Sequence, residues 1–378
     1  MGLQKSKRTY QLGPLGKLVK TGTNKFSPKV PPFSDPLPDE FTNPIVLKND
    51  CYENPWKGFK FPGLGGLLKF IFISKDNSNI PKSQELDKTL PVEKPNFDRL
   101  NNPPPNDIQV TWIGHASVLV QFDGLTVLTD PIFSQRASMS QWFGPKRFRP
   151  IPCEVKDLPN INIVVISHTH YDHLDHGSVQ QLNERFGKDL AWYVPKGTKQ
   201  WMTNVGCEDV TELTWWEEAV FPKKTDFKLV CTPCQHWCKR NLIDTNKALW
   251  GSWLVKGPKH SFYFAGDTAY CEGFEQIGRK YGPISFAAIP IGAYEPRNFM
   301  KNQHVNPEEA VKIHEDIKAE NSLGIHWGTF KLTTEHYLEP RSKLTEELKN
   351  KNIPISSFFT LPHGRVHVIG KDKLSNDE

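Results

Sequence analysis

The segment Ser167-His168-Thr169-His170-Tyr171-Asp172-His173 decides the class of fold that this sequence encodes. It follows directly on an apolar run, residues 161–166, which reads as a buried β-strand. Three histidines and one aspartate fall within six positions, and imidazole nitrogen and carboxylate oxygen are both good zinc ligands. A strand that ends in such a loop can direct two ligands at one metal ion and two at a second. The alternative is a polar surface loop, but the order H-x-H-x-D-H rarely arises by chance.

Three more residues of ligand type stand just past other apolar segments, after residues 230–233, 262–266 and 323–325. Such positions lie at the rim of a sheet, where active sites form. Each residue alone also reads as an ordinary turn residue. Together with the first segment they make five histidines and two aspartates, which is the ligand count of a binuclear site: His168, His170, Asp172, His173, His236, Asp267 and His326.

Strand-like and helix-like patterns alternate over residues 106–378, which we expect to form an α/β catalytic domain. Asp123-Gly124 marks a hairpin turn, and Asn306 is expected to cap a helix that runs to about Glu320. The other helices are expected at 177–186 and 341–349. Strands are expected at 110–113, 117–122, 125–129, 161–166, 191–194, 227–231, 249–255, 261–265, 286–289, 324–326 and 366–369.

Residues 1–105 have a different texture, because many of the 31 prolines crowd into them. Proline disfavours long helices and central strands, so this region is expected to be irregular. The apolar stretch 61–74 is its exception and is a candidate membrane-contact segment; packing onto the protein's own core is the alternative reading. The stretch is interrupted by Lys69, and no run of about eighteen apolar residues occurs anywhere, so no transmembrane helix is expected.

Composition narrows the class of protein further. Of the 378 residues, 37% are hydrophobic and 24% charged, which is enough for a sizeable core. The net charge of +5 is mild, and no aromatic-basic repeat of an RNA-binding module is present, so nucleic acid is not expected as a partner. The odd count of seven cysteines and the polar start without a signal peptide favour a reduced, intracellular protein.

The first residues also fit the acceptor pattern for N-myristoylation, with Gly2 after the initiator methionine and then Ser6. Lys5, Lys7 and Arg8 lie beside them, and one acyl chain plus a basic patch gives stable membrane attachment. A chance match to a loose pattern is the other reading, so the sequence leaves this modification open.

Several longer segments together resemble one known family. The order H-x-H-x-D-H, a distant His, G-D and a late G-x-H resembles the metallo-β-lactamase superfamily. The wider sequence is similar to the N-acyl-phosphatidylethanolamine-hydrolysing phospholipase D family over about residues 44–370. The matching segments are 111–117 (TWIGHAS), 168–173 (HTHYDH), 232–240 (TPCQHWCKR), 264–268 (FAGDT), 303–310 (QHVNPEEA) and 325–330 (IHWGTF).

The resemblance implies the metallo-β-lactamase fold, a four-layer αβ/βα sandwich, with two zinc ions. By that resemblance Asp267 bridges both ions and is catalytic, one ion is held by His168, His170 and His236, and the other by Asp172, His173 and His326. Two such cations can share a water whose pKa falls toward about 7, which makes a bridging hydroxide the attacking group. The implied reaction is hydrolysis of N-acyl-phosphatidylethanolamine to N-acylethanolamine and phosphatidic acid. The HxKxxxxD pair of the other phospholipase D class is absent from the sequence.

Residues outside the ligand set are predicted to serve the substrate or the ligands. The resemblance places His304 as a catalytic and substrate-binding residue, alongside Tyr171 and Gln303; bracing of a helix start and aromatic packing are the other readings. The basic pair at 239–240 could meet an anionic headgroup or amphiphile, or be solvated. His115 and His176 are expected to support the ligands by hydrogen bonds. The three cysteines at 231, 234 and 238 suggest a thiolate zinc site only weakly, because no second pair matches them.

The resemblance further implies a membrane phospholipid substrate, peripheral association with the cytosolic face of endomembranes, and a homodimer. A soluble metallo-hydrolase of the lactonase or nuclease type on the same fold remains an alternative. A catalytically silent lipid-binding scaffold is a third reading, and the complete ligand set argues against it.

Overall fold

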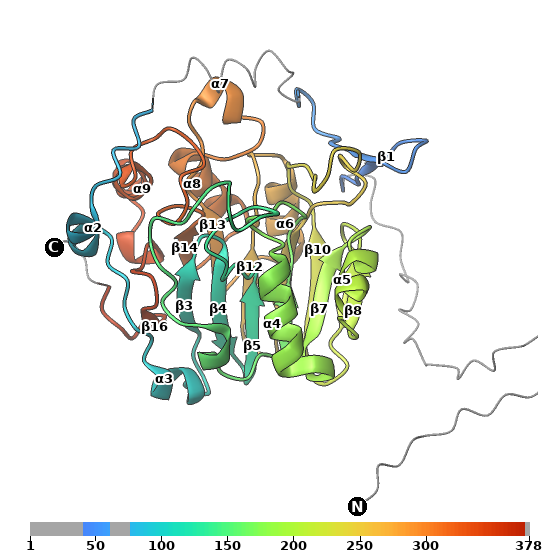
Figure 1. The fold of residues 1–378 in the computed structure, drawn as a ribbon, viewed down its shortest axis with the longest axis horizontal. Coiled ribbons are helices and arrows are strands. Elements are labelled where there is room, and N and C mark those ends of the chain that lie inside the picture. Colours follow the sequence, from blue (N-terminus) through green and yellow to red (C-terminus); the bar gives the residue numbers. More distant parts are fainter. Residues whose placement is uncertain (1–40, 61–75, 375–378) are drawn as a thin grey trace, which may run out of the picture. The chain divides into compact units, whose positions relative to one another are not determined.

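The computed structural model describes residues 41–60 and 76–374 of the chain. Two seven-stranded sheets form the centre of this part (Figure 1). Alternate residues of a central strand face opposite sides: in β4 (Ser117–Phe122), Val118 and Val120 lie in the larger hydrophobic core, while Leu119 packs in the cluster that includes Val179 of helix α4 (His176–Phe186). Both faces of the strand are therefore buried, which is why it reads as a nearly continuous apolar run.

The first sheet has the strand order β16-β3-β4-β5-β6-β7-β8. The strands from β16 to β5 pair antiparallel, and those from β5 to β8 pair parallel. Besides β4, the strands are β3 (Gln109–Gly114), β5 (Leu125–Thr129), β6 (Ile163–Val165), β7 (Ala191–Pro195), β8 (Val210–Leu213) and β16 (Val366–Val368).

The second sheet has the order β15-β14-β13-β12-β11-β10-β9. Here β9 to β12 pair antiparallel and β12 to β15 pair parallel. The strands are β9 (Glu218–Val220), β10 (Lys228–Thr232), β11 (Ser252–Lys256), β12 (Ser261–Phe264), β13 (Phe286–Pro290), β14 (Ser322–Ile325) and β15 (Phe358–Phe359).

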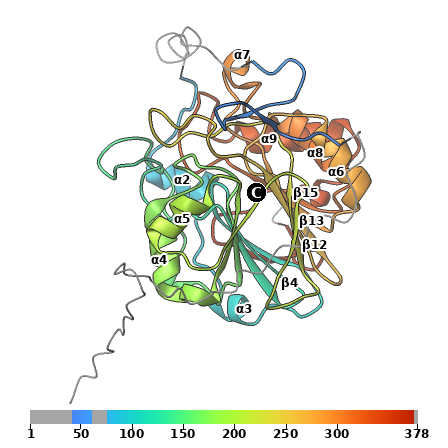
Figure 2. The ribbon, with the colours of Figure 1, turned by 90° about the vertical axis from the view of Figure 1, so that its right-hand side faces the viewer.

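Helices cover the outer faces of both sheets, as Figure 2 shows with α4 and α5 on one side and α6, α8 and α9 on the other. The bounds are α5 (Lys199–Val205), α6 (Gly273–Tyr281), α8 (Pro307–Asp316) and α9 (Glu339–Asn350). The helix α8 begins as predicted: the Asn306 side chain accepts from the backbone N–H of Glu309 in a capping box. The α/β class and the αβ/βα sandwich of the metallo-β-lactamase fold are thereby confirmed.

Shorter elements complete the described chain. They are the two-stranded β1 (Ile45–Val46) and β2 (Tyr52–Glu53), the helices α2 (Ser83–Thr89), α3 (Phe97–Asn101) and α7 (Arg297–Met300), and the 3₁₀ turns η1 (Val155–Asp157), η2 (Gly187–Asp189) and η3 (Ile355–Ser357). Leu86, Leu90 and Leu100 are buried in the hydrophobic cores, so the described residues before 106 pack as part of the same body. The boundary near residue 105 stays a prediction.

Two predictions fall on residues outside the described part of the chain, namely the apolar stretch 61–74 and the acceptor site at Gly2. Among the described residues, every helix is too short or too polar to cross a bilayer.

Strand direction determines where the functional residues gather. The strands β5, β6 and β7 run parallel in one sheet, and β10, β12, β13 and β14 run in a common direction in the other. The segments that follow the carboxyl ends of these strands meet at one end of the sandwich, because His173 after β6 contacts His326 after β14. That end receives the 167–173 segment after β6 and the single ligand-type residues after β10, β12 and β14.

Candidate metal centre

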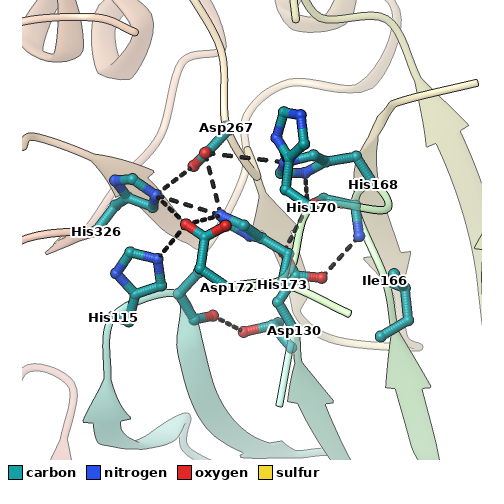
Figure 3. Close-up of polar contacts among 12 residues, drawn as sticks. His115, Asp130, Ile166, His168, His170, Asp172, His173, Asp267 and His326 are labelled. Atoms are coloured by element: carbon teal, nitrogen blue, oxygen red, sulfur yellow. Dashed lines mark hydrogen bonds and ion pairs between the residues drawn. The ribbon is translucent and has the colours of Figure 1, made fainter. Parts of the chain in front are cut away.

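All seven predicted ligands lie together at this end of the sandwich, and Figure 3 shows most of them turned toward a common centre. Five of the side chains are buried and two are partly exposed. The buried residues are His168, His173, His236, Asp267 and His326, and the partly exposed ones are His170 and Asp172.

Three imidazoles form the first set. Nε2 of His168 lies 2.7 Å from Nδ1 of His170, and Nε2 of His236 lies 3.2 Å from that same atom. Nδ1 of His236 donates to the carbonyl oxygen of Gln303 at 3.0 Å, so its Nε2 carries a lone pair. The Ser167 hydroxyl donates its proton to the Asp130 carboxylate, so it accepts a hydrogen bond from Nδ1 of His168 at 2.9 Å. Nε2 of His168 therefore also carries a lone pair. Lone pairs that converge on one point suit a cation.

The second set contains Asp172, His173 and His326. Nδ1 of His173 donates to Oδ2 of Asp130 at 2.6 Å, which leaves a lone pair on Nε2 when the ring is neutral. That Nε2 atom lies 3.2 Å from Nε2 of His326 and 3.2 Å from Oδ2 of Asp172. His115 contacts the same Asp172 oxygen through Nε2 at 2.8 Å, which is the supporting hydrogen bond expected of it.

Asp267 lies between the two sets. Its Oδ2 is 3.0 Å from Nε2 of His173, and its Oδ1 is 3.0 Å from Nε2 of His326. On the other side, Oδ2 is 4.0 Å from Nε2 of His168 and 3.9 Å from Nε2 of His236. One carboxylate therefore reaches both sets, which is the geometry that a bridging ligand requires.

The electrostatics of the cluster favour bound positive charge. Burial lowers the pKa of His170 to about 3 and that of His236 to about 4, so both rings are neutral at pH 7, the form that binds metal. Burial opposes ionisation of Asp267, but the neighbouring histidine charges outweigh it and hold its pKa well below the usual range. Burial also opposes protonation of His326, yet Asp267 and Asp172 raise its pKa to about 9. The buried carboxylate of Asp267 and the partly exposed one of Asp172 thus draw cationic charge into the cluster.

These residues fit divalent metal ions. Imidazole nitrogens and carboxylate oxygens make up the whole set, and this mixture suits zinc and related first-row ions. Within the part of the chain that the structure describes, three imidazole nitrogens in or beside the cluster are buried without a hydrogen-bond partner, Nε2 of His170, Nδ1 of His304 and Nδ1 of His326. The hydrogen bonds of His173 to Asp130 and of His236 to the Gln303 carbonyl already fix each ring with its other nitrogen toward the centre. The identity and number of the ions stay predictions.

The three predicted substrate residues lie around this centre in different ways. His304 is buried beside it, with Nδ1 3.9 Å from Oδ2 of Asp267. Gln303 accepts from His236 through its backbone carbonyl, and its side-chain oxygen accepts from Trp237 at 2.8 Å. The Tyr171 hydroxyl donates to a backbone carbonyl at 2.7 Å. The predicted roles of these three residues toward a substrate remain predictions.

Arg240 makes structural contacts with the ligand segment that the sequence did not indicate. Its Nη1 donates to the carbonyl oxygens of Thr169 at 3.0 Å and Leu174 at 2.6 Å, so it ties together the two ends of the ligand segment. Its guanidinium also stacks over the rings of Tyr171 and Trp201, at 4.4 and 4.6 Å from their centroids. Arg240 therefore positions the ligand segment, and a role in meeting an anionic headgroup is not needed to explain it.

Asp130 is the functional residue that sequence reasoning missed. It follows β5 directly, is fully buried, and accepts from the backbone N–H of Ser167 at 2.7 Å as well as from His173. The signal was present, because Asp130 stands just past an apolar strand like the predicted ligands. His176, by contrast, lies edge-on to Trp201 with ring centroids 5.9 Å apart, a packing contact in place of the support expected of it.

The cysteines beside His236 do not form a thiolate site. Cys231, Cys234 and Cys238 are buried, and burial raises the pKa of Cys238 to about 12. Burial also raises the pKa of the other two thiols, so all three are protonated at neutral pH. Among the described residues, none of the groups of converging ligand atoms includes these thiols.

Comparison with known proteins agrees with this geometry. Residues 126–327 match the family model of the β-lactamase superfamily domain. The fold is similar to Igni18, a metallo hydrolase from Ignicoccus hospitalis, with a TM-score of 0.54 and 16% identity over 71% of this chain and 100% of that one. An isothiocyanate hydrolase from Delia radicum gut bacteria is also similar, with a TM-score of 0.54 and 18% identity over 68% of this chain and 98% of that one. The protein is therefore a metallo-hydrolase of the metallo-β-lactamase superfamily, whose members bind divalent metal.

Two relatives narrow the assignment. The chain is 42% identical over 354 residues to N-acyl-phosphatidylethanolamine-hydrolyzing phospholipase D 1 of Caenorhabditis elegans, covering 89% of this chain and 98% of the relative. It is 34% identical over 332 residues to the mitochondrial protein of that name from Saccharomyces cerevisiae, covering 78% of this chain and 70% of the relative. Within the superfamily, the chain belongs to the N-acyl-phosphatidylethanolamine-hydrolysing phospholipase D family.

Proposed function

We propose that this protein is a zinc phosphodiesterase of the phospholipase D type, which hydrolyses N-acyl-phosphatidylethanolamine. The observation that carries the proposal is the placement of Asp267 between two sets of ligand side chains. The names of its relatives in C. elegans and yeast supply the substrate. In this reaction, water adds to phosphorus, the bond from phosphorus to the ethanolamine oxygen breaks, and phosphatidic acid and N-acylethanolamine are released.

Two of the ligand groups in the cluster support a division of the proposed ligands between two ions. His168, His170 and His236 hold one zinc ion, and the set of Asp172, His173 and His326 holds the other. Two zinc ions held there supply positive charge for an anionic phosphodiester and lower the pKa of bound water toward neutrality. A phosphodiester hydrolyses so slowly without help that this double assistance is well matched to it.

His304 is the chain's own group beside the reacting phosphate. Burial lowers its pKa well below the usual range, so the imidazole is neutral at physiological pH. A neutral ring can donate one hydrogen bond, and Nδ1 of His304 faces the cluster 3.9 Å from Asp267 without a partner of its own. We therefore assign His304 to orient an oxygen of the phosphate or of the leaving group, in preference to delivering a full proton.

The proposal includes the partners that the family resemblance implies. The substrate is a membrane phospholipid, so the enzyme works at the cytosolic face of endomembranes as a peripheral protein. A homodimer is part of the same proposal, and sedimentation of the zinc-loaded protein tests it.

The test is an assay on N-acyl-phosphatidylethanolamine in mixed micelles prepared in ¹⁸O water, with the zinc content of the same sample measured. Label is expected in the phosphatidic acid, because water attacks phosphorus. Label in the N-acylethanolamine would show cleavage of the carbon–oxygen bond and a different mechanism. No turnover of this lipid, with turnover of a lactone or a nucleic acid, would favour the soluble metallo-hydrolase alternative.

The variant Asp267→Asn tests the bridging residue, and Asp123→Asn is its matched control. Asp123 is also a carboxylate with a nearly buried side chain and a histidine partner, since its Oδ1 lies 2.8 Å from Nδ1 of His260. It lies before β5, at the end of the sandwich away from the cluster. Asp267→Asn is expected to lose turnover and metal, while Asp123→Asn keeps both. Full activity of Asp267→Asn would remove Asp267 from the mechanism.

A further inference from the structure

Two loops expose large apolar side chains that a water-soluble surface normally covers. Met139, Trp142 and Phe143 are 72%, 90% and 63% exposed, and Leu242 and Ile243 are 91% and 81% exposed. We call these five residues the rim patch. Single exposed apolar residues need no explanation, but five of them concentrated at two loop tips mark an interaction surface.

The first loop is built to hold its apolar side chains outward. Arg136 donates through Nε to the carbonyl oxygen of Gln141 at 3.2 Å and through Nη1 to that of Gly144 at 2.6 Å. The Gln141 side chain returns a hydrogen bond to the Arg136 carbonyl at 3.1 Å. The loop thus satisfies its polar groups internally, and Trp142 and Phe143 remain at its tip.

The second loop has the same design with different residues. One carboxylate oxygen of Asp244 accepts from the backbone N–H groups of Arg240 at 3.0 Å and Asn241 at 2.8 Å. The Asn241 side chain accepts from the backbone N–H of Ile243 at 2.9 Å. These bonds close the turn beneath Leu242 and Ile243, so the two side chains point to solvent in a defined turn.

Both loops stand at the mouth of the metal cluster. They follow β5 and β10, whose carboxyl ends lie at the end of the sandwich where the ligands meet, and in Figure 2 the blue-green loop after β5 projects from the body at the upper left. Each loop is also bonded to the ligand segment or to the helix start that follows it. Ser134 donates to the Asp175 carboxylate at 2.7 Å, and Arg240 donates to the carbonyls of Thr169 and Leu174.

Basic residues flank both tips. Lys146 is exposed beside the first, and Lys247 is exposed beside the second. Apolar tips with lysines at their base match a lipid–water interface, where tryptophan sits at headgroup level and lysine meets anionic headgroups.

We propose that the rim patch inserts into a lipid bilayer and docks the mouth of the metal site on the membrane surface. Membrane binding by the rim patch does not depend on the proposed function. Its benefit to catalysis does rest on that function, because docking there lets a phospholipid reach the metals without crossing bulk water. The anchoring residues are named from this chain alone, and they add to any contribution from residues 61–74.

The experiment measures binding of the full-length, metal-loaded protein to vesicles of phosphatidylcholine with about 20% phosphatidylserine. The double variants Trp142→Ser/Phe143→Ser and Leu242→Ser/Ile243→Ser are each expected to weaken partitioning about tenfold, because the apolar area that enters the bilayer is lost. Val220→Ser is the matched control. Val220 is also exposed, at 47%, but it pairs with Lys228 at the start of β10, at the opposite end of the sandwich.

Each variant is also assayed on a water-soluble phosphodiester, and its sedimentation is recorded. The expected result is unchanged turnover of the soluble substrate, unchanged sedimentation, weaker vesicle binding and slower turnover of vesicle-borne lipid. Vesicle binding equal to the wild type in both double variants overturns the proposal. A change from dimer to monomer without loss of vesicle binding also overturns it and assigns the patch to a second copy of the chain. Vesicle binding is measured without turnover. The binding result therefore stands even if the protein does not hydrolyse N-acyl-phosphatidylethanolamine.

Discussion

Asp130→Asn is expected to weaken metal binding by about 10–100-fold while the fold is kept, since partners of metal-bound histidines carry effects of this size. The carboxylate of Asp130 accepts three hydrogen bonds: from Ser167 N–H at 2.7 Å, from Ser167 Oγ at 2.5 Å and from His173 Nδ1 at 2.6 Å. Asparagine has nearly the same shape but only one acceptor oxygen. The Ser167 N–H bonds to Oδ1, whereas the Ser167 hydroxyl and His173 Nδ1 share Oδ2. An amide that keeps its oxygen on the backbone N–H therefore turns its NH₂ group toward both the hydroxyl and the His173 ring.

The consequence follows from the tautomer of His173. When the amide donates to Nδ1, the ring proton moves to Nε2, the atom that lies 3.0 Å from Oδ2 of Asp267 in the cluster. A protonated Nε2 cannot bind metal. If the proton returns to Nδ1 of His173, that N–H group faces the N–H of the new amide, and the two repel each other. The loss of one hydrogen bond to a charged group costs about 1.5–3 kcal/mol. That range corresponds to about 10–100-fold in affinity, which agrees with the expected effect.

The assay is a competition titration of the metal-free protein with zinc and a chromogenic chelator, run beside thermal unfolding. Asp130→Asn should need more free zinc for half-maximal activity, and excess zinc should restore much of the rate. The control is Asp123→Asn, which loses an acceptor for His260 but leaves the cluster untouched. A zinc affinity of Asp130→Asn equal to that of Asp123→Asn would refute the reasoning.

Three other predictions follow from the described contacts. Arg240→Met removes two hydrogen bonds to the carbonyls of Thr169 and Leu174 and should lower the unfolding free energy by about 2 kcal/mol and turnover by about tenfold. The control Lys239→Met should change both little. Equal effects of the two variants would contradict the positioning role of Arg240. Exhaustive chelation should abolish activity and lower Tm, and zinc should restore both, whereas full activity after chelation would exclude a metal mechanism. Burial lowers the pKa of His314 to about 4, so its neutral form stabilises the fold above pH 6.5 and this stability is lost as pH falls toward 4. The wild-type advantage in unfolding free energy over His314→Gln should therefore shrink by about 2 kcal/mol between pH 7.5 and 5, and a constant difference would contradict it.

The ligand side chains could be predicted because each one follows an apolar strand. Residues just past apolar strands lie at the rim of a sheet, which made His236, Asp267 and His326 candidates. Their meeting with the 167–173 segment, which follows a strand of the other sheet, was predicted from the ligand count and the family resemblance. Asp130 follows the same rule, yet Asp-Pro after a strand also reads as an ordinary turn, and only the buried contact with His173 separates the two readings.

Other features could not be read from local pattern. The role of Arg240 depends on carbonyl oxygens far away in sequence, and a backbone acceptor leaves no mark on residue type. The strands β8 and β9 were not predicted because Glu212 and Glu218 interrupt their apolar pattern at the edges of the sheets. The strand β15 has only two residues, which is too short for any periodicity to appear.

The pairing of β16 with β3 sets an order of events during synthesis. The edge of β3 is covered only when residues 366–368 have left the ribosome, because β16 is the outermost strand of the first sheet. A nascent chain that stalls earlier carries every residue of the cluster but still presents an open strand edge, which favours pairing with other chains. Truncation upstream of β16 should therefore give aggregates in place of a soluble apoprotein.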